Sequence, residues 1–258
     1  MQTLPDLTTK ALGHTLVHLE QVDSTNKYAR LAAHTLPDLA VVLADSQTQG
    51  KGRAGRSWES APGDGLYMSV LLKQLPPEHL SRLPLTAALG VCAGLGQLCG
   101  KRFDIKWPND VLFEGGKLCG VLCESQLNAQ SSVATLGIGV NLRQTREALD
   151  GLGLVYATSL FLATNKHFSA KMVAAAICNA LETALERISR PVLWEEYRQR
   201  CVTLGKQVKI LRAGSETPAR AVDIAPDGSL LCEIDGQVVP VSAGDVSVRG
   251  LGGYSVDS

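Results

Sequence analysis

The stretch GKGRAGR, residues 50–56, places three glycines and three cations in seven consecutive positions. Glycine lets a backbone approach a ligand closely. Lysine and arginine donate charge-assisted hydrogen bonds to carboxylate or phosphate oxygens, and arginine can do so bidentately. This composition is typical of a loop that wraps an anion. A mobile basic surface loop is the alternative interpretation on local composition alone.

Two nucleotide-binding motifs partly match this stretch. Its glycines fit the dinucleotide fingerprint G-x-G-x-x-G, and it nearly fits the P-loop, with Arg56 where that motif requires lysine. Both motifs need a helix after the glycines. Residues 57–65 are turn formers instead, and residues 66–72 follow as an apolar strand. The sequence therefore predicts a long glycine loop between two strands.

Length and charge exclude several classes of protein. The 258 residues suffice for one or two hydrophobic cores. Lys plus Arg number 25 and Asp plus Glu number 25, so the net charge does not indicate a nucleic-acid or membrane partner. No apolar run reaches the roughly 18 residues of a transmembrane helix. Residues 1–10 also lack the apolar region of a signal peptide. We expect a cytoplasmic protein.

The cysteines and histidines form no recognisable metal site. Seven cysteines include no C-x-x-C pair, and the five histidines are scattered without ligand spacing. Free, buried thiols in a reducing cytosol are the interpretation that this pattern favours over a zinc site. No metal-ligating residue is therefore predicted.

Polar residues stand before a helix and after a strand that are predicted early in the chain. Ser24, Thr25 and Asn26 precede a helix predicted at residues 27–33. Simple N-capping is one interpretation, but three such side chains exceed what one cap needs. The surplus could bind a polar ligand at the helix N-terminus. Gln47, which follows a strand predicted at residues 39–44, is either an ordinary loop amide or a residue that projects toward the ligand of the glycine loop.

The segment FDIKWPND, residues 103–110, is predicted to be a strand that ends in a rigid turn. Strand alternation places Phe103, Ile105 and Trp107 on one face and Lys106 on the other. A lysine at such a position is commonly a solvated edge charge. In the strand predicted at residues 133–140, Gly137 and Gly139 share a face. Glycine inside a strand often marks the close approach of a ligand.

The remaining segments define an α+β chain with two predicted domains. Helices are predicted at residues 84–98, 169–188 and 192–201, whereas residues 143–154 show no pattern and are predicted to be a flexible loop. Short, evenly spaced strands then follow and favour a small barrel; they are predicted at 207–211, 219–224, 230–234, 237–241 and 246–249. The predicted boundary near Leu204 gives domains at residues 1–204 and 205–258.

Several of these segments together resemble a biotin–protein ligase. The resemblance runs in consistent order from about Asp23 to Asn141 and resumes in the tail. It is carried by STN at 24–26, Gln47, GKGRAGR at 50–56, KWPND at 106–110, KLCG at 117–120, GIGVN at 137–141 and SAGDVSVR at 242–249. The basic glycine loop and the KWPND run are highly specific in combination, although neither would be specific alone.

The resemblance implies a fold and a reaction. It implies a catalytic domain with a mixed sheet, related to class II aminoacyl-tRNA synthetases, and a C-terminal SH3-like barrel. The implied substrates are biotin and Mg²⁺-bound ATP, which form biotinyl-adenylate and pyrophosphate. A lysine of a biotin carboxyl carrier domain, such as that of acetyl-CoA carboxylase, then takes the biotinyl group and AMP leaves. Positioning and electrostatics suffice for such chemistry, so no side-chain nucleophile is needed.

The resemblance also implies roles for individual residues. Lys106 and Arg53 are expected to be catalytic, contacting both the biotin carboxylate and the α-phosphate, where negative charge develops. The implied biotin-binding residues are Ser24, Thr25, Asn26, Gln47, Gly50, Lys51, Gly52, Arg53, Lys106, Gly137 and Gly139. In this reading the last two glycines leave room for the bicycle of biotin. The implied ATP and adenylate contacts are Arg53, Arg56, Trp58, Lys106 and Asn141.

Three departures from the family pattern qualify the resemblance. Ala54 and Lys51 stand where the family often has arginine, so the affinity for adenylate is expected to differ. Larger members carry an N-terminal helix-turn-helix repressor, and the residues before Val22 are too few for one. We therefore expect no DNA binding, and a monomer or weak homodimer. The alternatives are a lipoate or octanoate ligase on the same scaffold, and a biotin-responsive regulator without turnover.

Overall fold

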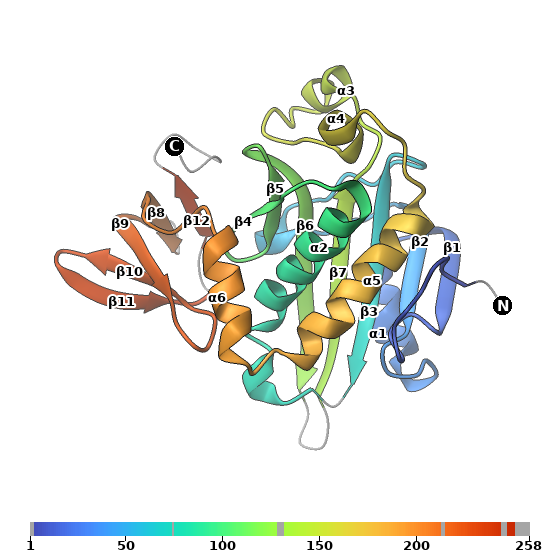
Figure 1. The fold of residues 1–258 in the computed structure, drawn as a ribbon, viewed down its shortest axis with the longest axis horizontal. Helices are drawn as coiled ribbons and strands as arrows, with labels where there is room; N and C mark the ends of the chain where they lie inside the picture. Colours follow the sequence, from blue (N-terminus) through green and yellow to red (C-terminus); the bar gives the residue numbers. More distant parts are fainter. Residues whose placement is uncertain (1–2, 74, 128–131, 213–214, 244–246, 251–258) are drawn as a thin grey trace.

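Two β-sheets, joined by helices, form the framework of the chain (Figure 1). The computed structural model describes residues 3–73, 75–127, 132–212, 215–243 and 247–250. The larger sheet has seven strands in the order β1-β2-β3-β7-β6-β5-β4. These strands are β1 (Leu16–Val22), β2 (Val41–Gln47), β3 (Gly65–Lys73), β4 (Asp104–Lys106), β5 (Asp110–Phe113), β6 (Gly116–Leu127) and β7 (Ser132–Asn141).

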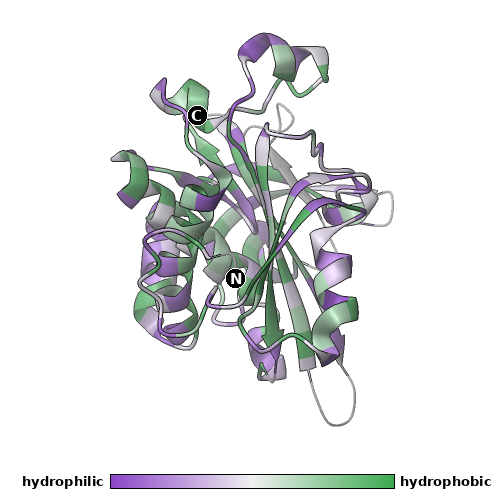
Figure 2. Cartoon of the chain, turned by 90° about the vertical axis from the view of Figure 1, so that its right-hand side faces the viewer, coloured by the Kyte–Doolittle hydropathy of each residue, from purple (hydrophilic) through white to green (hydrophobic). Residues whose placement is uncertain are grey.

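The larger sheet is mixed, as the sequence predicted. Strands β1 and β2 run parallel, whereas the other neighbours pair antiparallel. The central strands are rich in β-branched and aliphatic residues and are largely green in the hydropathy view of Figure 2. Every residue of β3 from Gly65 to Leu72 is buried, because helices cover both faces of the sheet at this point. The hydrophobic core therefore lies along the middle strands.

Two long helices cover one face of the larger sheet. They are α2 (Leu83–Cys99) and α5 (Ala170–Glu186), which lie side by side in Figure 1. A Cβ atom at Gly94 would lie only 2.4 Å from the backbone oxygen of Ala176, so only glycine permits this approach. Gly94 therefore allows α2 and α5 to pack closely.

Shorter helices occupy the connections. Helix α1 (Thr25–Leu31) contacts β2, β3 and β7 and begins two residues before the predicted start. The prediction of a flexible loop at residues 143–154 is wrong, because α3 (Arg146–Gly151) lies within it. The Thr145 hydroxyl accepts a hydrogen bond from the backbone N–H of Ala148 and caps this helix. Helix α4 (Leu160–Thr164) was not predicted. The Ser159 hydroxyl caps it by accepting a hydrogen bond from the backbone N–H of Leu162.

The C-terminal sheet has five strands in the order β11-β10-β9-β8-β12. Its strands are β8 (Gln207–Arg212), β9 (Ser215–Ile224), β10 (Leu230–Ile234), β11 (Gln237–Val241) and β12 (Ser247–Gly250), all paired antiparallel. The five predicted strands are confirmed. Of the SAGDVSVR stretch that carried part of the resemblance, residues 244–246 lie outside the described residues. The boundary near Leu204 stays a prediction.

Hydrogen bonds attach the C-terminal sheet to the larger one. The indole N–H of Trp107 donates to the backbone oxygen of Gly228, 3.1 Å away, in the turn between β9 and β10. From α6 (Pro191–Arg200), Arg198 donates to Asp223 and to the backbone oxygen of Ile224 at 2.5 and 2.7 Å. The segment that carries Lys106 is therefore held between the two sheets.

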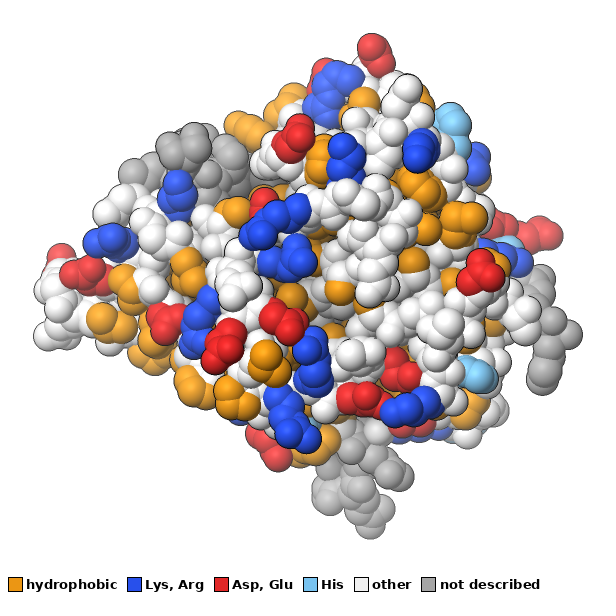
Figure 3. Space-filling model, in the orientation of Figure 1, with side chains coloured by type: hydrophobic (Ala, Val, Ile, Leu, Met, Phe, Trp, Pro, Cys, Tyr) orange, Lys and Arg blue, Asp and Glu red, His pale blue; other side chains and the backbone are white. Residues whose placement is uncertain are grey.

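The cysteines are free, as predicted, and are buried or half-buried. Burial raises the pKa of Cys92 to about 12 and that of Cys178 to about 12, so these thiols are not activated nucleophiles. On the face seen in Figure 3, lysine and arginine side chains are interspersed with acidic ones, in keeping with a net charge of zero. Across the described ranges, no helix is long and apolar enough to cross a membrane.

Candidate functional site

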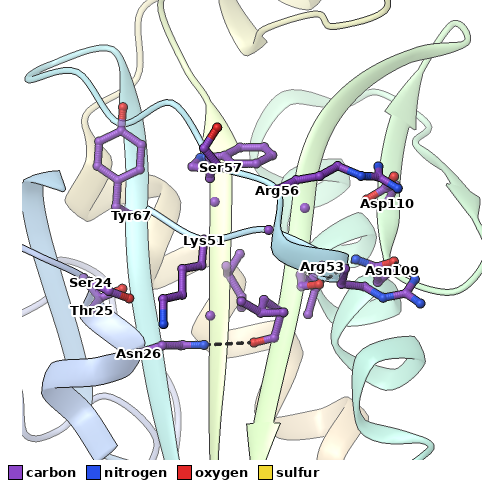
Figure 4. Close-up of a pocket in the computed structure, with 18 of the residues that line it drawn as sticks. Ser24, Thr25, Asn26, Lys51, Arg53, Arg56, Ser57, Tyr67, Asn109 and Asp110 are labelled. Atoms are coloured by element: carbon purple, nitrogen blue, oxygen red, sulfur yellow. Dashed lines mark hydrogen bonds between the residues drawn. The ribbon is translucent and has the colours of Figure 1, made fainter. Parts of the chain in front are cut away.

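A pocket opens on the face of the larger sheet that carries α1, opposite α2 and α5 (Figure 4). Its walls come from the start of α1, the glycine loop, the turn between β4 and β5, and strands β6 and β7. Twelve of the predicted site residues line it: Ser24, Thr25, Asn26, Gln47, Lys51, Gly52, Arg53, Arg56, Trp58, Lys106, Gly137 and Gly139. The fold therefore brings together segments that are more than 100 residues apart in the sequence.

The glycine loop folds back on itself as a short hairpin. Lys51 and Ser57 form an isolated β-bridge, and the N–H of Gly52 donates to the backbone oxygen of Arg56 at 2.7 Å. Between them Ala54 and Gly55 have φ values of 55° and 74°. Positive φ costs alanine free energy, whereas glycine adopts it readily. The hairpin turns Lys51 into the pocket, toward Asn26 (Figure 4).

Arg53 lies at the other side of the pocket, beside Asn109 (Figure 4). Its guanidinium donates to Asn109 Oδ1 at 2.9 Å and to the backbone oxygen of Ala243, which follows β11. Asn109 is itself buried, and its amide donates to the backbone oxygen of Val121 at 2.6 Å. Burial lowers the pKa of Arg53, while Asp110 acts in the opposite direction. The guanidinium remains charged, because its pKa stays far above neutral pH.

Lys106 is buried at the end of β4, with 4% of its surface exposed. The alternative of a solvated edge charge is therefore excluded, because the side chain turns into the pocket. Its neighbours fix the strand: the N–H of Val202 donates to the Ile105 oxygen at 2.9 Å, and the N–H of Trp107 donates to Thr203 Oγ1 at 3.0 Å. A cation removed from water favours an anion nearby. Lys106 is placed to attract one.

Trp58 covers a flat patch made by two glycines. The pairing of β6 with β7 sets Gly120 directly beside Gly139. A Cβ atom would lie 2.6 Å from the Trp58 ring at Gly139 and 3.0 Å from it at Gly120. Lys117 lies over the indole, with Nζ 5.4 Å from the ring centroid, and forms a 2.8 Å ion pair with Asp110. The indole N–H is buried without a hydrogen-bond partner among the described residues.

These contacts show what surrounds the two glycines in β7. They were expected to leave room for the bicycle of biotin. In this structure the space over Gly139 is occupied by Trp58, and a Cβ atom at Gly137 would lie 2.7 Å from Asn26 Oδ1. In the described structure the close approach to both glycines is made by the protein's own side chains, and their expected role toward biotin stays a prediction.

The inner end of the pocket is polar. Gln47 accepts from the backbone N–H of Thr25 at 2.9 Å and donates to Ser60 Oγ at 3.0 Å. Asn26 donates to Glu124 Oε2 at 2.9 Å. Ser24 holds the N-cap position of α1 without a side-chain capping bond among the described contacts. Simple capping therefore does not account for these polar residues, which form a hydrogen-bonded cluster that lines the pocket.

Two predicted residues are not among those that line the described pocket. A Cβ atom at Gly50 would lie 2.3 Å from the backbone oxygen of Trp58, so this glycine lets the loop close on the strand behind it. Asn141 is turned toward the segment before α4, where its amide donates to the Thr158 oxygen at 2.9 Å. Its expected contact with adenine stays a prediction.

Sequence reasoning missed several residues that line the pocket. They include Ser57, Tyr67, Asn109, Asp110 and Lys117. Asn109, Asp110 and Lys117 stood inside the KWPND and KLCG motifs, so the motifs themselves carried the signal. Tyr67 had no such signal. Burial raises its pKa well above the usual value, and its hydroxyl donates to the Ala61 oxygen at 2.9 Å.

Known proteins share both parts of this architecture. Residues 18–141 match the biotin/lipoate A/B protein ligase family, and residues 203–249 match the biotin protein ligase C terminal domain. A biotin–[acetyl-CoA-carboxylase] ligase of Mycobacterium tuberculosis is 35% identical over 236 residues, covering 88% of this chain and 86% of that protein. The chain belongs to the biotin protein ligase family.

Other members of the biotin protein ligase family extend the likeness. The bifunctional ligase/repressor of Bacillus subtilis is 29% identical over 255 residues, covering 94% of this chain and 76% of that protein. The structure of biotin protein ligase from Aquifex aeolicus in complex with biotin and ATP has a TM-score of 0.75 and 31% identity. That likeness covers 92% of this chain and 99% of the Aquifex chain. The fold and the arrangement of both sheets are thus those of the family.

Proposed function

We propose that this chain is an ATP-dependent biotin–protein ligase. In the first step an oxygen of the biotin carboxylate attacks the α-phosphorus of Mg²⁺-bound ATP, forming biotinyl-5′-AMP and releasing pyrophosphate. In the second step the ε-amine of a carrier lysine attacks the acyl carbon, forming an amide and releasing AMP. The observation that carries the proposal is the convergence of Lys51, Arg53 and Lys106 on one pocket whose inner end is polar.

The cations address the difficulty of the first step, in which two anions must meet. Lys106 is buried and Arg53 is anchored by Asn109, so both charges are held in place before the ligands arrive. Preorganised charges stabilise a developing anion without the reorganisation that water would need. We assign Lys106 and Arg53 to the carboxylate and the α-phosphate. Lys51 is assigned to the carboxylate and Arg56 to the phosphates.

The polar inner end suits the uncharged head of biotin. A ureido ring carries N–H donors and a carbonyl acceptor, which need partners when they are buried. Ser24, Thr25, Asn26 and Gln47 supply hydroxyl and amide groups there. Lipoate and octanoate carry no such head, so a lipoate or octanoate ligase is the less favoured second candidate. A regulator without turnover would not require a buried Lys106.

The proposed macromolecular partner is the biotin carboxyl carrier domain of a carboxylase. The names of the relatives from Mycobacterium tuberculosis and Paracoccus denitrificans include acetyl-CoA carboxylase, which supports this choice. Free thiols favour a reducing compartment such as the cytoplasm. The zero net charge favours the absence of a nucleic-acid partner. A monomer or weak homodimer remains our proposal for the state in solution.

The decisive experiment is acid-dependent exchange of radioactive pyrophosphate into ATP, with biotin and lipoate assayed in parallel. We expect exchange with biotin and none above background with lipoate. Transfer is then followed on a recombinant biotin carboxyl carrier domain, with its acceptor lysine replaced by arginine as the control. Exchange that depends on lipoate and not on biotin would overturn the proposed substrate. Biotin binding without any exchange would favour the regulator.

A further inference from the structure

A chain of hydrogen bonds links β6, α1, β3 and β2 and ends at the inner end of the pocket. Asn26 Nδ2 lies 2.9 Å from Glu124 Oε2, and Asn26 Oδ1 lies 2.7 Å from Ser69 Oγ. Ser69 Oγ lies 2.8 Å from Thr25 Oγ1, which in turn lies 3.1 Å from Gln47 Oε1. Ser69 is fully buried in β3. The proton positions along this chain decide what the pocket offers a ligand.

The orientation of the Asn26 amide is fixed from one side. Its nitrogen faces the Glu124 carboxylate and, at 3.3 Å, the backbone oxygen of Leu122. Both groups are acceptors only, so the NH₂ end of the amide must point toward them. The carbonyl oxygen of Asn26 therefore points toward Ser69.

The hydroxyl proton of Ser69 is therefore donated to Asn26. Asn26 Oδ1 carries no hydrogen, so the 2.7 Å contact is favourable only when the Ser69 hydroxyl donates to it. Ser69 then has no proton left for Thr25. The Thr25 hydroxyl can donate either to Ser69 Oγ at 2.8 Å or to Gln47 Oε1 at 3.1 Å. We assign its proton to the shorter contact, because Gln47 Oε1 already accepts from the backbone N–H of Thr25. The lone pairs of Thr25 Oγ1 are left for other partners.

Gln47 is fixed in the same way from the other side. The Ser60 hydroxyl donates to the backbone oxygen of Trp58 at 2.9 Å, so Ser60 Oγ accepts from the Gln47 amide nitrogen. Gln47 Oε1 faces the backbone N–H of Thr25. Thr25 Oγ1 and Gln47 Oε1 thus stand 3.1 Å apart as two acceptors. Two adjacent acceptors repel each other until a donor is placed between them.

We propose that Glu124 and Ser69 are positioning residues that set the pocket's preference for a ligand head with an N–H donor. Neither side chain is among those that line the described pocket, and both act through Asn26 and Thr25. The inference rests on the proposed function and deepens it. A cyclic urea supplies the required donor, whereas a dithiolane or an alkyl chain supplies none. A head with an acceptor oxygen in place of the N–H meets two acceptors and is repelled.

The test compares biotin with its two cyclic-carbamate analogues, in each of which one ring N–H is replaced by oxygen. The measured quantity is the ratio of kcat/KM in pyrophosphate exchange for biotin to that for each analogue. In the parent we expect a ratio above about 100 for the analogue whose oxygen faces Thr25, because a buried acceptor left facing acceptors is strongly disfavoured. The pair of analogues identifies which ring nitrogen faces the two acceptors.

Ser69→Ala releases the Thr25 hydroxyl, which can then turn and donate to the analogue's oxygen. We expect this variant to lower the ratio at least tenfold, with the KM for biotin raised about tenfold and the KM for ATP unchanged. Glu124→Met removes the acceptor that orients Asn26 and is expected to lower the ratio likewise. Glu124→Gln keeps an acceptor oxygen and is expected to retain the parent ratio.

A buried hydroxyl outside the chain of hydrogen bonds provides the control. Ser46, in β2, is buried and lies 3.3 Å from the backbone oxygen of Glu20. Ser46→Ala is expected to leave the ratio unchanged. If Ser69→Ala does not fold, the comparison of Glu124→Met with Glu124→Gln decides the question.

The outcomes separate this proposal from the proposed function. Equal losses of kcat/KM for biotin and for the analogues in Ser69→Ala or Glu124→Met would show a purely structural role and overturn the positioning roles. An active parent with a ratio near one would overturn the acceptor pair itself. A parent without biotin-dependent exchange would refute the proposed function, and this inference with it.

Discussion

Replacing Lys106 tests the electrostatic basis of the proposed adenylation. In Lys106→Met the side chain keeps most of its length and loses its charge. Lys106 is almost fully buried, so solvent screens its charge little. At an effective dielectric constant of about 20, two unit charges about 4 Å apart interact by about 4 kcal/mol. Such a loss in the transition state corresponds to about a thousandfold in rate.

The assay for Lys106→Met is biotin-dependent pyrophosphate exchange under saturating ATP. We expect kcat/KM to fall by about 10²–10³, the range seen when one preorganised group at a developing anion is removed. Thermal unfolding should show that the variant is folded. Lys101, an exposed lysine shortly before β4, gives the matched control Lys101→Met, which should keep full activity. Exchange within about twofold of the parent for Lys106→Met would refute the reasoning.

Three further predictions concern the stability of the fold. Burial alone would raise the pKa of Glu182, but three backbone N–H groups of the N-terminal segment outweigh it and lower the pKa below 4.5; Glu182→Gln should therefore lower Tm at pH 7, and its difference from the parent should begin to shrink below pH 4.5 and be lost as the pH falls through the lowered pKa of the folded state. Gly94→Ala places a Cβ atom 2.4 Å from a backbone oxygen of α5 and should lower the free energy of unfolding, measured in urea, by about 1–3 kcal/mol. The control is Gly151→Ala, where a Cβ atom meets open space, and it should change the free energy of unfolding little. Cys92 should resist iodoacetamide at pH 7 in the native state and react after denaturation, because burial raises its pKa to about 12; rapid native labelling would contradict this.

The sequence by itself determined most of the secondary structure and most members of the site. Alternating apolar residues and local turn formers predicted the strands on both sides of the glycine loop, because strand period and turn chemistry are local properties. Twelve predicted site residues line one pocket, since the motifs that carry them are short and chemically distinctive. Helix α3 was missed because its six residues show no apolar period, and its only signal was the cap at Thr145.

The tertiary structure alone decided what the motif residues contact. Gly137 and Gly139 indicated that some group approaches β7 closely. Only the register of β6, β3 and β7 shows that Asn26 lies against Gly137 and Trp58 against Gly139. The roles of Ser69 and Glu124 are equally invisible in the sequence. A buried serine in an apolar strand and a glutamate near a strand end look ordinary. The direction of a shared proton depends on which acceptors the fold places around it, and those acceptors come from residues up to 98 positions apart.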